Sequence, residues 1–325
     1  MNAVRGRLAP SPTGAQHIGN ARTYLLAWLS ARSQHGEVRL RIEDIDIWRN
    51  KPQAVEQLHR DLAWLGITTD GPSLLQSSQL DAHSDALRRL RELQLVYPCT
   101  CSRADILNAA SAPHVGHEEP IYPGTCAHRR AEEASDLTQP YAWRFRVTHS
   151  PEFTDLFAGY TTVDLQRVGG DFVVWRSANV PAYQLAVAVD DAAAGITEVV
   201  RGDDLLSSTP RQLLIAEALG LGSPKYAHVP LVVGVDGRRL AKRHGDTRLV
   251  ALAEAGVAPE ALLGLIAWSC GWIDRVKPIT ARELVPLFRW GSLPRQPWVL
   301  QPEQLHAIGY VEPIPTGAAA RPCPS

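Results

Sequence analysis

Residues 5–20 read RGRLAPSPTGAQHIGN, and this stretch decides how the rest of the chain is organised. Its first apolar residues predict the end of a short buried strand, and the prolines and Gly14 that follow predict an ordered turn. From Gly19 onward, apolar residues recur at helical spacing at Ala21, Tyr24, Leu25, Trp28 and Leu29. A strand, a tight turn and a helix N-terminus gather unpaired backbone N–H groups, which predicts a phosphate site. His17 could add a neutral or cationic donor there.

A short His-x-Gly motif matches by chance, so the alternative is an ordinary turn with a solvent-exposed histidine. The next strand bears on this choice, because residues 38–46 alternate between apolar and charged side chains and end in Glu43, Asp44 and Asp46. Ligands of open α/β sheets bind beyond the carboxyl ends of the strands. We therefore expect these carboxylates in the same crevice as the first turn, the alternative being helix capping or simple solvation.

Composition limits the class of protein. The chain has 325 residues, 45% hydrophobic content and a formal net charge of −1, which predicts two or more domains and no global basic field for nucleic acid. RNA contacts would then depend on local basic patches. The sequence contains neither an 18-residue apolar run nor a targeting segment, so we expect a soluble, cytoplasmic monomer that does not bind membranes. Five cysteines, an odd number, argue against a disulfide framework.

Periodicity predicts the remaining elements. Asn50 as N-cap and Pro52 in the first turn predict a helix that ends before Gly66. Further helices are expected over 80–95, 212–219, 251–255, 259–270 and 280–287, the last ones around a core of Trp268, Trp272, Trp290 and Trp298. Strands are expected over 143–147 and 172–176, with hairpins over 153–165 and 230–240. The apolar run 181–191 predicts a central parallel strand.

Three of the five cysteines fall within 28 residues and predict a metal site. Cys99 and Cys101 can hold one ion from a knuckle, and Cys126 can close the site from a distant turn. A tetrahedral zinc needs a fourth ligand, for which Tyr122 and His128 are the candidates; imidazole is the commoner ligand chemically. The alternative is three buried free cysteines. Residues 108–119, between the two cysteine segments, are expected to form a flexible excursion.

The second half of the α/β pattern carries two cationic features. Arg201 follows a predicted strand over 196–200, where a guanidinium could grip a carboxylate with two parallel hydrogen bonds. Residues 239–245 read RLAKRHG, and a mobile basic loop of this kind could meet a polyphosphate. Taken alone, such a loop is usually just solvated.

Together these residues resemble one family, the class I aminoacyl-tRNA synthetases of the glutamate type. The resemblance covers roughly residues 5–300 and rests on three separated motifs in family order. The HIGH-type motif is His17-Ile18-Gly19-Asn20, with asparagine where the second histidine usually lies. The KMSKS-type motif is the segment 239–243, which departs at three positions but keeps the key lysine as Lys242. The strand end RIEDID at 41–46 also matches.

The resemblance implies an α/β fold with a Rossmann-type nucleotide-binding domain. It also implies the roles of individual residues. Glutamate would be bound by Arg7, Leu8, Ala9, Pro10, Ser11, Glu43, Tyr183 and Arg201. ATP, accompanied by Mg²⁺, would be bound by His17, Gly19, Asn20 and Lys242, with His17 and Lys242 as the catalytic residues. Arginines suit the carboxylates of glutamate, and Glu43 suits its α-ammonium group.

The chain stops where the anticodon-binding domain of such synthetases should begin. It therefore resembles the truncated glutamyl-Q branch, which glutamylates the queuosine base of tRNA(Asp). In that branch the zinc motif is Cys-x-Cys…Tyr-x-x-x-Cys, which implies one structural Zn²⁺ on Cys99, Cys101, Tyr122 and Cys126. The expected division is a split catalytic domain (1–98 and 181–248), a zinc-containing α+β insertion like an acceptor-binding domain (99–180), a helical stem-contact-like subdomain (249–311) and a flexible tail (312–325).

Three other functions are considered. A truncated glutamyl-tRNA synthetase would charge the 3′ end of tRNA(Glu) or tRNA(Gln) with the same site. A small-molecule nucleotidyltransferase would explain His17 and Lys242, but not the match through Glu43, Tyr183 and Arg201. A non-catalytic, zinc-stapled RNA-binding module is favoured only by the altered KMSKS-type loop. We expect the glutamyl-Q function.

Overall fold

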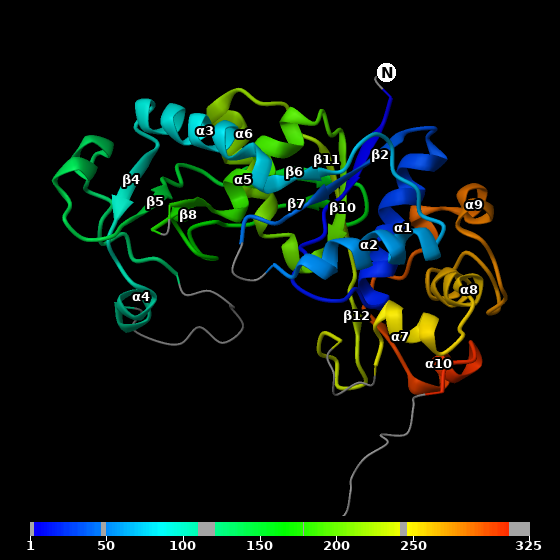
Figure 1. The fold of residues 1–325 in the computed structure, drawn as a ribbon. Helices are drawn as coiled ribbons and strands as arrows, with labels where there is room; N and C mark the ends of the chain where they lie inside the picture. The colour runs from blue at the N-terminus through cyan, green and yellow to red at the C-terminus, as the bar shows by residue number, and fades with distance from the viewer. Residues whose placement is uncertain (1–2, 47–49, 110–120, 178, 241–245, 312–325) are drawn as a thin grey trace, which may run out of the picture.

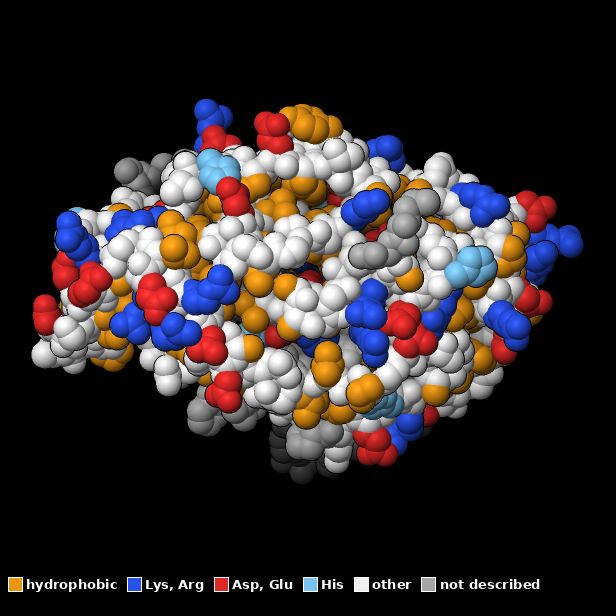
Figure 2. Space-filling view, turned by 90° about the horizontal axis from the view of Figure 1, so that it is seen from above, with side chains coloured by type: hydrophobic (Ala, Val, Ile, Leu, Met, Phe, Trp, Pro, Cys, Tyr) orange, Lys and Arg blue, Asp and Glu red, His pale blue; other side chains and the backbone are white. Residues whose placement is uncertain are grey.

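The structure is a computed structural model that describes residues 3–46, 50–109, 121–177, 179–240 and 246–311. Figure 1 shows an elongated molecule, with strands running through its middle, helices α3 and α6 over one part and helices α7 to α10 gathered at the other. Charged side chains of both signs are interspersed on the face seen in Figure 2, as expected for a chain with a net charge of −1.

Parallel strands form the centre of the molecule. Strand β1 (Arg5–Leu8) pairs with β2 (Glu37–Ile42), which pairs with the short β3 (Leu74–Leu75). On the other side of β1, its first residue is hydrogen-bonded to the residue that precedes β10: the Thr197 N–H donates to Arg5 O at 2.9 Å. Strand β10 (Glu198–Gly202) pairs in parallel with β11 (Lys225–Val229). The predicted α/β class is thus confirmed.

Helix α1 (Ile18–Ser33) connects β1 to β2 and is buried along most of its length. Its leucines at 25, 26 and 29 are fully buried in a core that continues into the C-terminal helices. Helix α2 (Pro52–Trp64) follows β2 and ends where Gly66 adopts a positive φ of 68°. The prediction of Asn50 as its N-cap is wrong, because Lys51 occupies that position while the Asn50 amide donates to the Asp44 carbonyl.

The apolar run at 181–191 is a helix and not a strand, which corrects the prediction. Helix α5 (Tyr183–Ala193) follows the short strand β9 (Val180–Pro181). An unbroken apolar run has neither the period of a strand nor that of a helix when the element is buried on all sides. Residues 185–191 are all buried, and the alanines within the run favour a helix.

Along the chain, an antiparallel block separates the parallel strands β1 and β2 from β10 and β11, and Figure 1 shows it at one end of the molecule. Its strands pair in the order β4, β5, β8, β9, and its bounds are β4 Val96–Cys99, β5 Ala142–Phe145 and β8 Phe172–Arg176. The predicted hairpin is confirmed as β6 (Phe153–Asp155) with β7 (Gly159–Thr161). Helices α3 (Leu80–Glu92), α5 and α6 (Ser208–Leu219) pack on this block through one apolar cluster.

Helix α3 and the segment after Cys101 border this block. Helix α3 confirms the helix predicted over 80–95, and its Leu87 and Leu90 are buried. The short helix α4 (Arg103–Ala109) follows Cys101. Most of the excursion predicted at 108–119 lies outside the described residues.

The C-terminal part is helical as predicted and shares the core of α1. Its elements are α7 (Leu249–Glu254), α8 (Pro259–Ser269), α9 (Ala281–Leu284), β13 (Trp298–Val299) and α10 (Pro302–Ala307). Trp298 is buried as predicted. Trp268 is 38% exposed, so the prediction that it belongs to the core is wrong. The flexible tail predicted at 312–325 lies outside the described residues. No helix of the described chain is long and apolar enough to cross a membrane.

The hairpin predicted at 230–240 is reduced to a turn. Strand β12 (Val232–Val233) makes a single antiparallel bridge to Arg239, across a turn in which Gly237 has a φ of 71°. The main partner of β12 is β13, which pairs with it in parallel. This pairing fixes the last strand of the chain against the segment that precedes the basic loop.

Candidate active site

A cavity of about 670 Å³ opens where β1, β2 and β10 end. The turn after β1 is held to neighbouring segments by two backbone bonds, from Glu43 N–H to Pro10 O (2.9 Å) and from Lys51 N–H to Pro12 O (3.1 Å). The cavity is lined by eleven of the twelve residues predicted for the glutamate and ATP sites, namely Arg7, Leu8, Ala9, Pro10, Ser11, His17, Gly19, Asn20, Glu43, Tyr183 and Arg201. The twelfth, Lys242, lies outside the described residues; Leu240, two positions earlier in the sequence, lines the cavity.

The N-terminus of α1 differs from the expected cradle of free N–H groups. His17 is the N-cap, and its Nδ1 accepts from the N–H groups of Gly19 (3.0 Å) and Asn20 (3.4 Å). The Ile18 N–H donates to Thr247 O at 3.1 Å. The prediction of unpaired N–H groups is therefore wrong for this helix end, because the His17 side chain accepts from two of them and the Thr247 carbonyl from a third.

The same contacts decide between the two forms expected for His17. An Nδ1 that accepts hydrogen bonds has no proton, so the ring is neutral and its one N–H is at Nε2. Burial lowers the pKa of His17, which favours the same form. Gly19 allows this arrangement, because a Cβ at that position would come within 2.9 Å of the His17 ring. His17 can thus offer one neutral Nε2–H donor to the cavity.

Four charged side chains, three of them buried, form a network beneath the glutamate side of the cavity. Arg41 on β2 is paired with Asp191 on α5 and donates to Glu43 at 3.1 Å. Arg7 on β1 lies 3.5 Å from the same Asp191 carboxylate. Arg7, Arg41 and Asp191 are each 5% exposed or less. The network places a cation and an acid, Arg7 and Glu43, side by side in the lining.

Burial and the neighbouring arginines shift the pKa values of Glu43 and Asp191 in opposite directions. Burial raises the pKa of Glu43 above its ordinary value of 4.5, and Arg41 and Arg7 only partly offset this. Burial would also raise the pKa of Asp191, but Arg41 and Arg7 outweigh it and hold that pKa below its ordinary value. Asp191 is therefore a fixed negative charge, whereas Glu43 titrates closer to neutrality.

Arg201 stands at the end of β10 with its guanidinium buried. It donates to Thr209 Oγ1 (2.8 Å) and to Gln212 Oε1 (2.9 Å), both on α6, and to His228 Nε2 (3.0 Å) on β11. Tyr183 at the start of α5 is 37% exposed and lies beside it in the lining. This arrangement presents a fixed cation and an accessible phenol to the same space.

A second cavity of about 350 Å³ adjoins the first and shares Ser11, Thr13, Glu43 and Tyr183 with it. It extends toward the antiparallel block, where Arg176 on β8 donates to Asp46 at 2.5 Å. The first cavity is therefore continuous with additional space on the side of that block.

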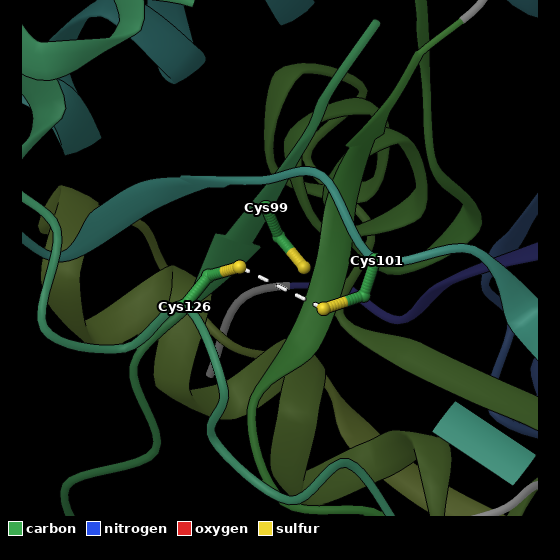
Figure 3. Close-up of side chains that lie close together, drawn as sticks. All are labelled: Cys99, Cys101 and Cys126. Carbon is green, nitrogen blue, oxygen red and sulfur yellow. Dashed lines mark hydrogen bonds between the residues drawn. The ribbon is translucent and has the colours of Figure 1, made fainter. Parts of the chain in front are cut away.

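The three cysteines predicted to bind metal lie together. Their sulfur atoms are all within 4.8 Å of one another, and Cys101 Sγ is 3.6 Å from Cys126 Sγ (Figure 3). The Tyr122 hydroxyl is 3.4 Å from Cys99 Sγ and accepts from the Cys126 N–H at 2.8 Å. His128 is exposed, and no histidine joins the cluster among the described residues. Three thiols and a phenol thus form a donor set suited to a metal ion such as zinc.

Residues 3–306 match the family model described as tRNA synthetases class I (E and Q), catalytic domain. The chain belongs to this family. It is 46% identical over 318 residues to a protein of Symbiobacterium thermophilum named glutamyl-Q tRNA(Asp) synthetase, covering 93% of this chain and 98% of that protein. A protein of the same name from Rhodopirellula baltica is 45% identical, covering 92% and 97%. These matches place the chain in the glutamyl-Q branch.

Full-length glutamate synthetases match this class I tRNA synthetase less completely. The glutamate–tRNA ligase of Geobacter sulfurreducens is 36% identical over 94% of this chain but only 65% of its own length. The crystal structure of the glutamate-tRNA synthetase from Elizabethkingia anophelis superposes with a TM-score of 0.79 at 25% identity, covering 93% of this chain and 69% of that one. The predicted class I catalytic fold is confirmed, and the protein is a ligase.

Sequence reasoning did not identify Arg41, Asp191 or His228 in this synthetase. Arg41 was read as the charged side of an alternating strand, although it is buried. The available signal was a pair of acids, Asp190 and Asp191, at the end of an otherwise apolar run. A helix that is apolar on all sides has no face in water, so acids within it need buried cations as partners.

Proposed function

We propose that this ligase activates L-glutamate with ATP and transfers it to the queuosine base of tRNA(Asp). The observation that supports this most strongly is the lining of the larger cavity, which combines Arg7, Arg201 and Glu43 at one end with His17 at the other. Two cations and one acid suit a dicarboxylate with an ammonium group. The relatives named glutamyl-Q tRNA(Asp) synthetase support the choice of acceptor.

In the first step, an oxygen of the glutamate α-carboxylate attacks the α-phosphorus of ATP. The bond to pyrophosphate breaks, and glutamyl-adenylate forms. Glu43 holds the α-ammonium, Arg7 and Arg201 orient the carboxylates, and the Nε2–H of His17 donates to the phosphates. Mg²⁺ bound with ATP would neutralise phosphate charge. Catalysis then consists of positioning and charge stabilisation.

In the second step, a hydroxyl of the queuosine cyclopentenediol attacks the glutamyl carbonyl carbon. The ester bond forms, the bond between the carbonyl carbon and the bridging oxygen of AMP breaks, and AMP leaves. The hydroxyl proton passes to the departing AMP phosphate or to solvent. The second cavity, which extends from Glu43 toward Arg176, provides room for the acceptor beside the glutamyl group. No covalent intermediate with the protein is required.

The test is ATP-dependent transfer of labelled glutamate to two tRNA(Asp) preparations, one with queuosine and one without. We expect labelling of the queuosine-containing tRNA alone. Labelling of unmodified tRNA(Glu), with neither tRNA(Asp) labelled, would instead identify a minimal conventional synthetase. Glutamate-dependent ATP–pyrophosphate exchange, measured in parallel, tests the activation step separately from the acceptor.

The pH dependence of glutamate binding tests Glu43. Its pKa is raised, so as the pH falls Glu43 is protonated earlier than an ordinary glutamate and loses its attraction for the α-ammonium. The KM for glutamate, measured from high pH down to the lowest pH at which the enzyme stays folded, should therefore be constant at high pH and then rise at a higher pH than an ordinary glutamate carboxyl would cause. Glu43→Gln should have a high KM across this range without that rise. A wild-type KM that does not change over the range would contradict the role of Glu43.

We also propose that the cysteine cluster holds one structural Zn²⁺ with Tyr122 as the fourth ligand. Protein purified without chelators is then expected to contain about one zinc per chain, and chelation should lower its melting temperature. Cys126→Ala should lose the metal. Cys270→Ala is the matched control, because this buried cysteine lies outside the cluster. A zinc content near zero in the wild-type protein would reject the site.

A further inference from the structure

The direction in which Arg201 points is fixed by its partners. A guanidinium has five N–H donors, and three of those of Arg201 are bonded to Thr209, Gln212 and His228. Two donors are left for a ligand in the cavity that Arg201 lines. Its Nε, which could otherwise rotate the whole fork, is held by His228 alone among the described residues. Accurate presentation of the two remaining donors therefore depends on the His228 ring.

His228 is itself held in one tautomer and one orientation. Its Nε2 accepts from Arg201, so the ring proton is at Nδ1, which donates to Asp155 Oδ2 at 2.7 Å. The ring stacks on Tyr226, with centroids 6.0 Å apart, and meets Phe153 edge-on at 6.2 Å. His228 is 2% exposed. These contacts hold the ring in place and shield it from bulk solvent.

Asp155 connects this arrangement to the hairpin of the antiparallel block. It ends β6 and is buried, and its carboxylate also accepts from the N–H groups of Phe157 (2.9 Å) and Ala158 (2.7 Å) in the hairpin turn. The backbone N–H of His228 donates to the same carboxylate at 3.1 Å. The hairpin thus delivers a fully bonded acid to a histidine on β11.

We propose that Asp155 and His228 are positioning residues that orient Arg201 for the carboxylate of glutamate. The hairpin β6–β7 is then part of the amino-acid pocket and not only a surface appendage of the block. This inference rests on the proposed role of Arg201 in glutamate binding.

Two amide substitutions separate the contacts of His228. Asn places its NH₂ near the former Nδ1, so His228→Asn can keep the bond to Asp155 but has no acceptor for Arg201. Gln places its carbonyl near the former Nε2, so His228→Gln can keep the acceptor for Arg201. We expect His228→Asn to raise the KM for glutamate roughly tenfold and His228→Gln to raise it less than about threefold. The KM for ATP should stay unchanged in both, measured by pyrophosphate exchange.

His83→Gln is the matched control for loss of a buried histidine. His83 is fully buried and bonded to Asp190 at 2.7 Å, but it does not contact Arg201. The His83→Gln variant should have a lower melting temperature but an unchanged KM for glutamate. If His228→Asn behaves like His83→Gln, or if the two His228 variants raise the KM equally, His228 is only structural and the proposal is overturned.

A double-mutant cycle separates this proposal from the proposed function. Arg201→Ala should raise the glutamate KM, and adding His228→Asn to it should change nothing further, because His228 acts through Arg201. Additive effects would overturn the positioning role. An unchanged KM in Arg201→Ala itself would instead remove Arg201 from the glutamate pocket, which is a failure of the proposed function.

Discussion

Asp191→Asn is expected to lower the free energy of unfolding by about 3–5 kcal/mol, because it leaves buried cations without their counter-charge. Asp191 is paired with Arg41 and lies 3.5 Å from Arg7, and all three side chains are buried. The asparagine keeps the shape of the side chain and removes only the charge. Two other acids lie near Arg41. Glu43 is bonded to it at 3.1 Å, but burial raises the pKa of Glu43, and the Asp190 carboxylate is farther away, at 4.0 Å, so neither fully replaces Asp191.

The measurement is equilibrium denaturation at neutral pH, with Asp85→Asn as the matched control. Asp85 pairs with Arg88 at 3.3 Å on the surface of α3, where both side chains are more than half exposed. Removing such a pair costs about 0–1 kcal/mol. A loss in Asp191→Asn no larger than that of Asp85→Asn would mean that the cations beneath the cavity are solvated, in contrast to the structure described above.

Local signals explain why much of the site could be predicted from the sequence. The turn after β1, the N-terminus of α1 and the acidic end of β2 each occupy a few consecutive residues with distinctive chemistry, and each contributes to the cavity lining. Of the three acids predicted there, Glu43 lines the cavity, Asp46 lines the second cavity, and Asp44 instead accepts hydrogen bonds from Ser77. The cysteines were found in the same way, from their spacing. The parallel-sheet rule then brought these segments together, because ligands bind where parallel strands end.

Long-range pairs could not be predicted from this one sequence. Arg41 and Asp191 are 150 residues apart, and Asp155 and His228 are 73 apart. A charged residue on an alternating strand gives no sign of whether a partner on a distant helix buries it. The same limit explains α5: an unbroken apolar run reveals burial, but the partners that make it a helix lie elsewhere in the chain.

The capping role of His17 was missed for a different reason. A helix N-terminus after a turn predicts free N–H groups by default, and only the rotamer of the side chain shows that Nδ1 occupies two of them. This finding changes the expected source of positive charge for ATP. A neutral histidine and a helix end whose N–H groups are already bonded attract a polyphosphate less strongly than the sequence suggested.

Lys242→Ala is therefore expected to slow glutamyl-adenylate formation by roughly 10²–10³-fold. Among the described residues at the ATP end of the cavity, His17 is neutral and Arg239 is already paired with Asp204. Negative charge develops on the leaving pyrophosphate. We therefore propose that Lys242, the key lysine of the basic loop by resemblance, supplies the protein's counter-charge for it.

Pyrophosphate exchange at saturating glutamate measures this rate, and the glutamate KM should change little because Lys242 is not assigned to the amino-acid end. Lys242→Arg, which keeps the charge, is the matched variant and should retain more of the rate. Lys277→Ala, on the C-terminal helical part, controls for loss of a lysine elsewhere. Equal small effects of Lys242→Ala on rate and on glutamate KM would remove this lysine from the activation step and leave the altered loop without a catalytic role.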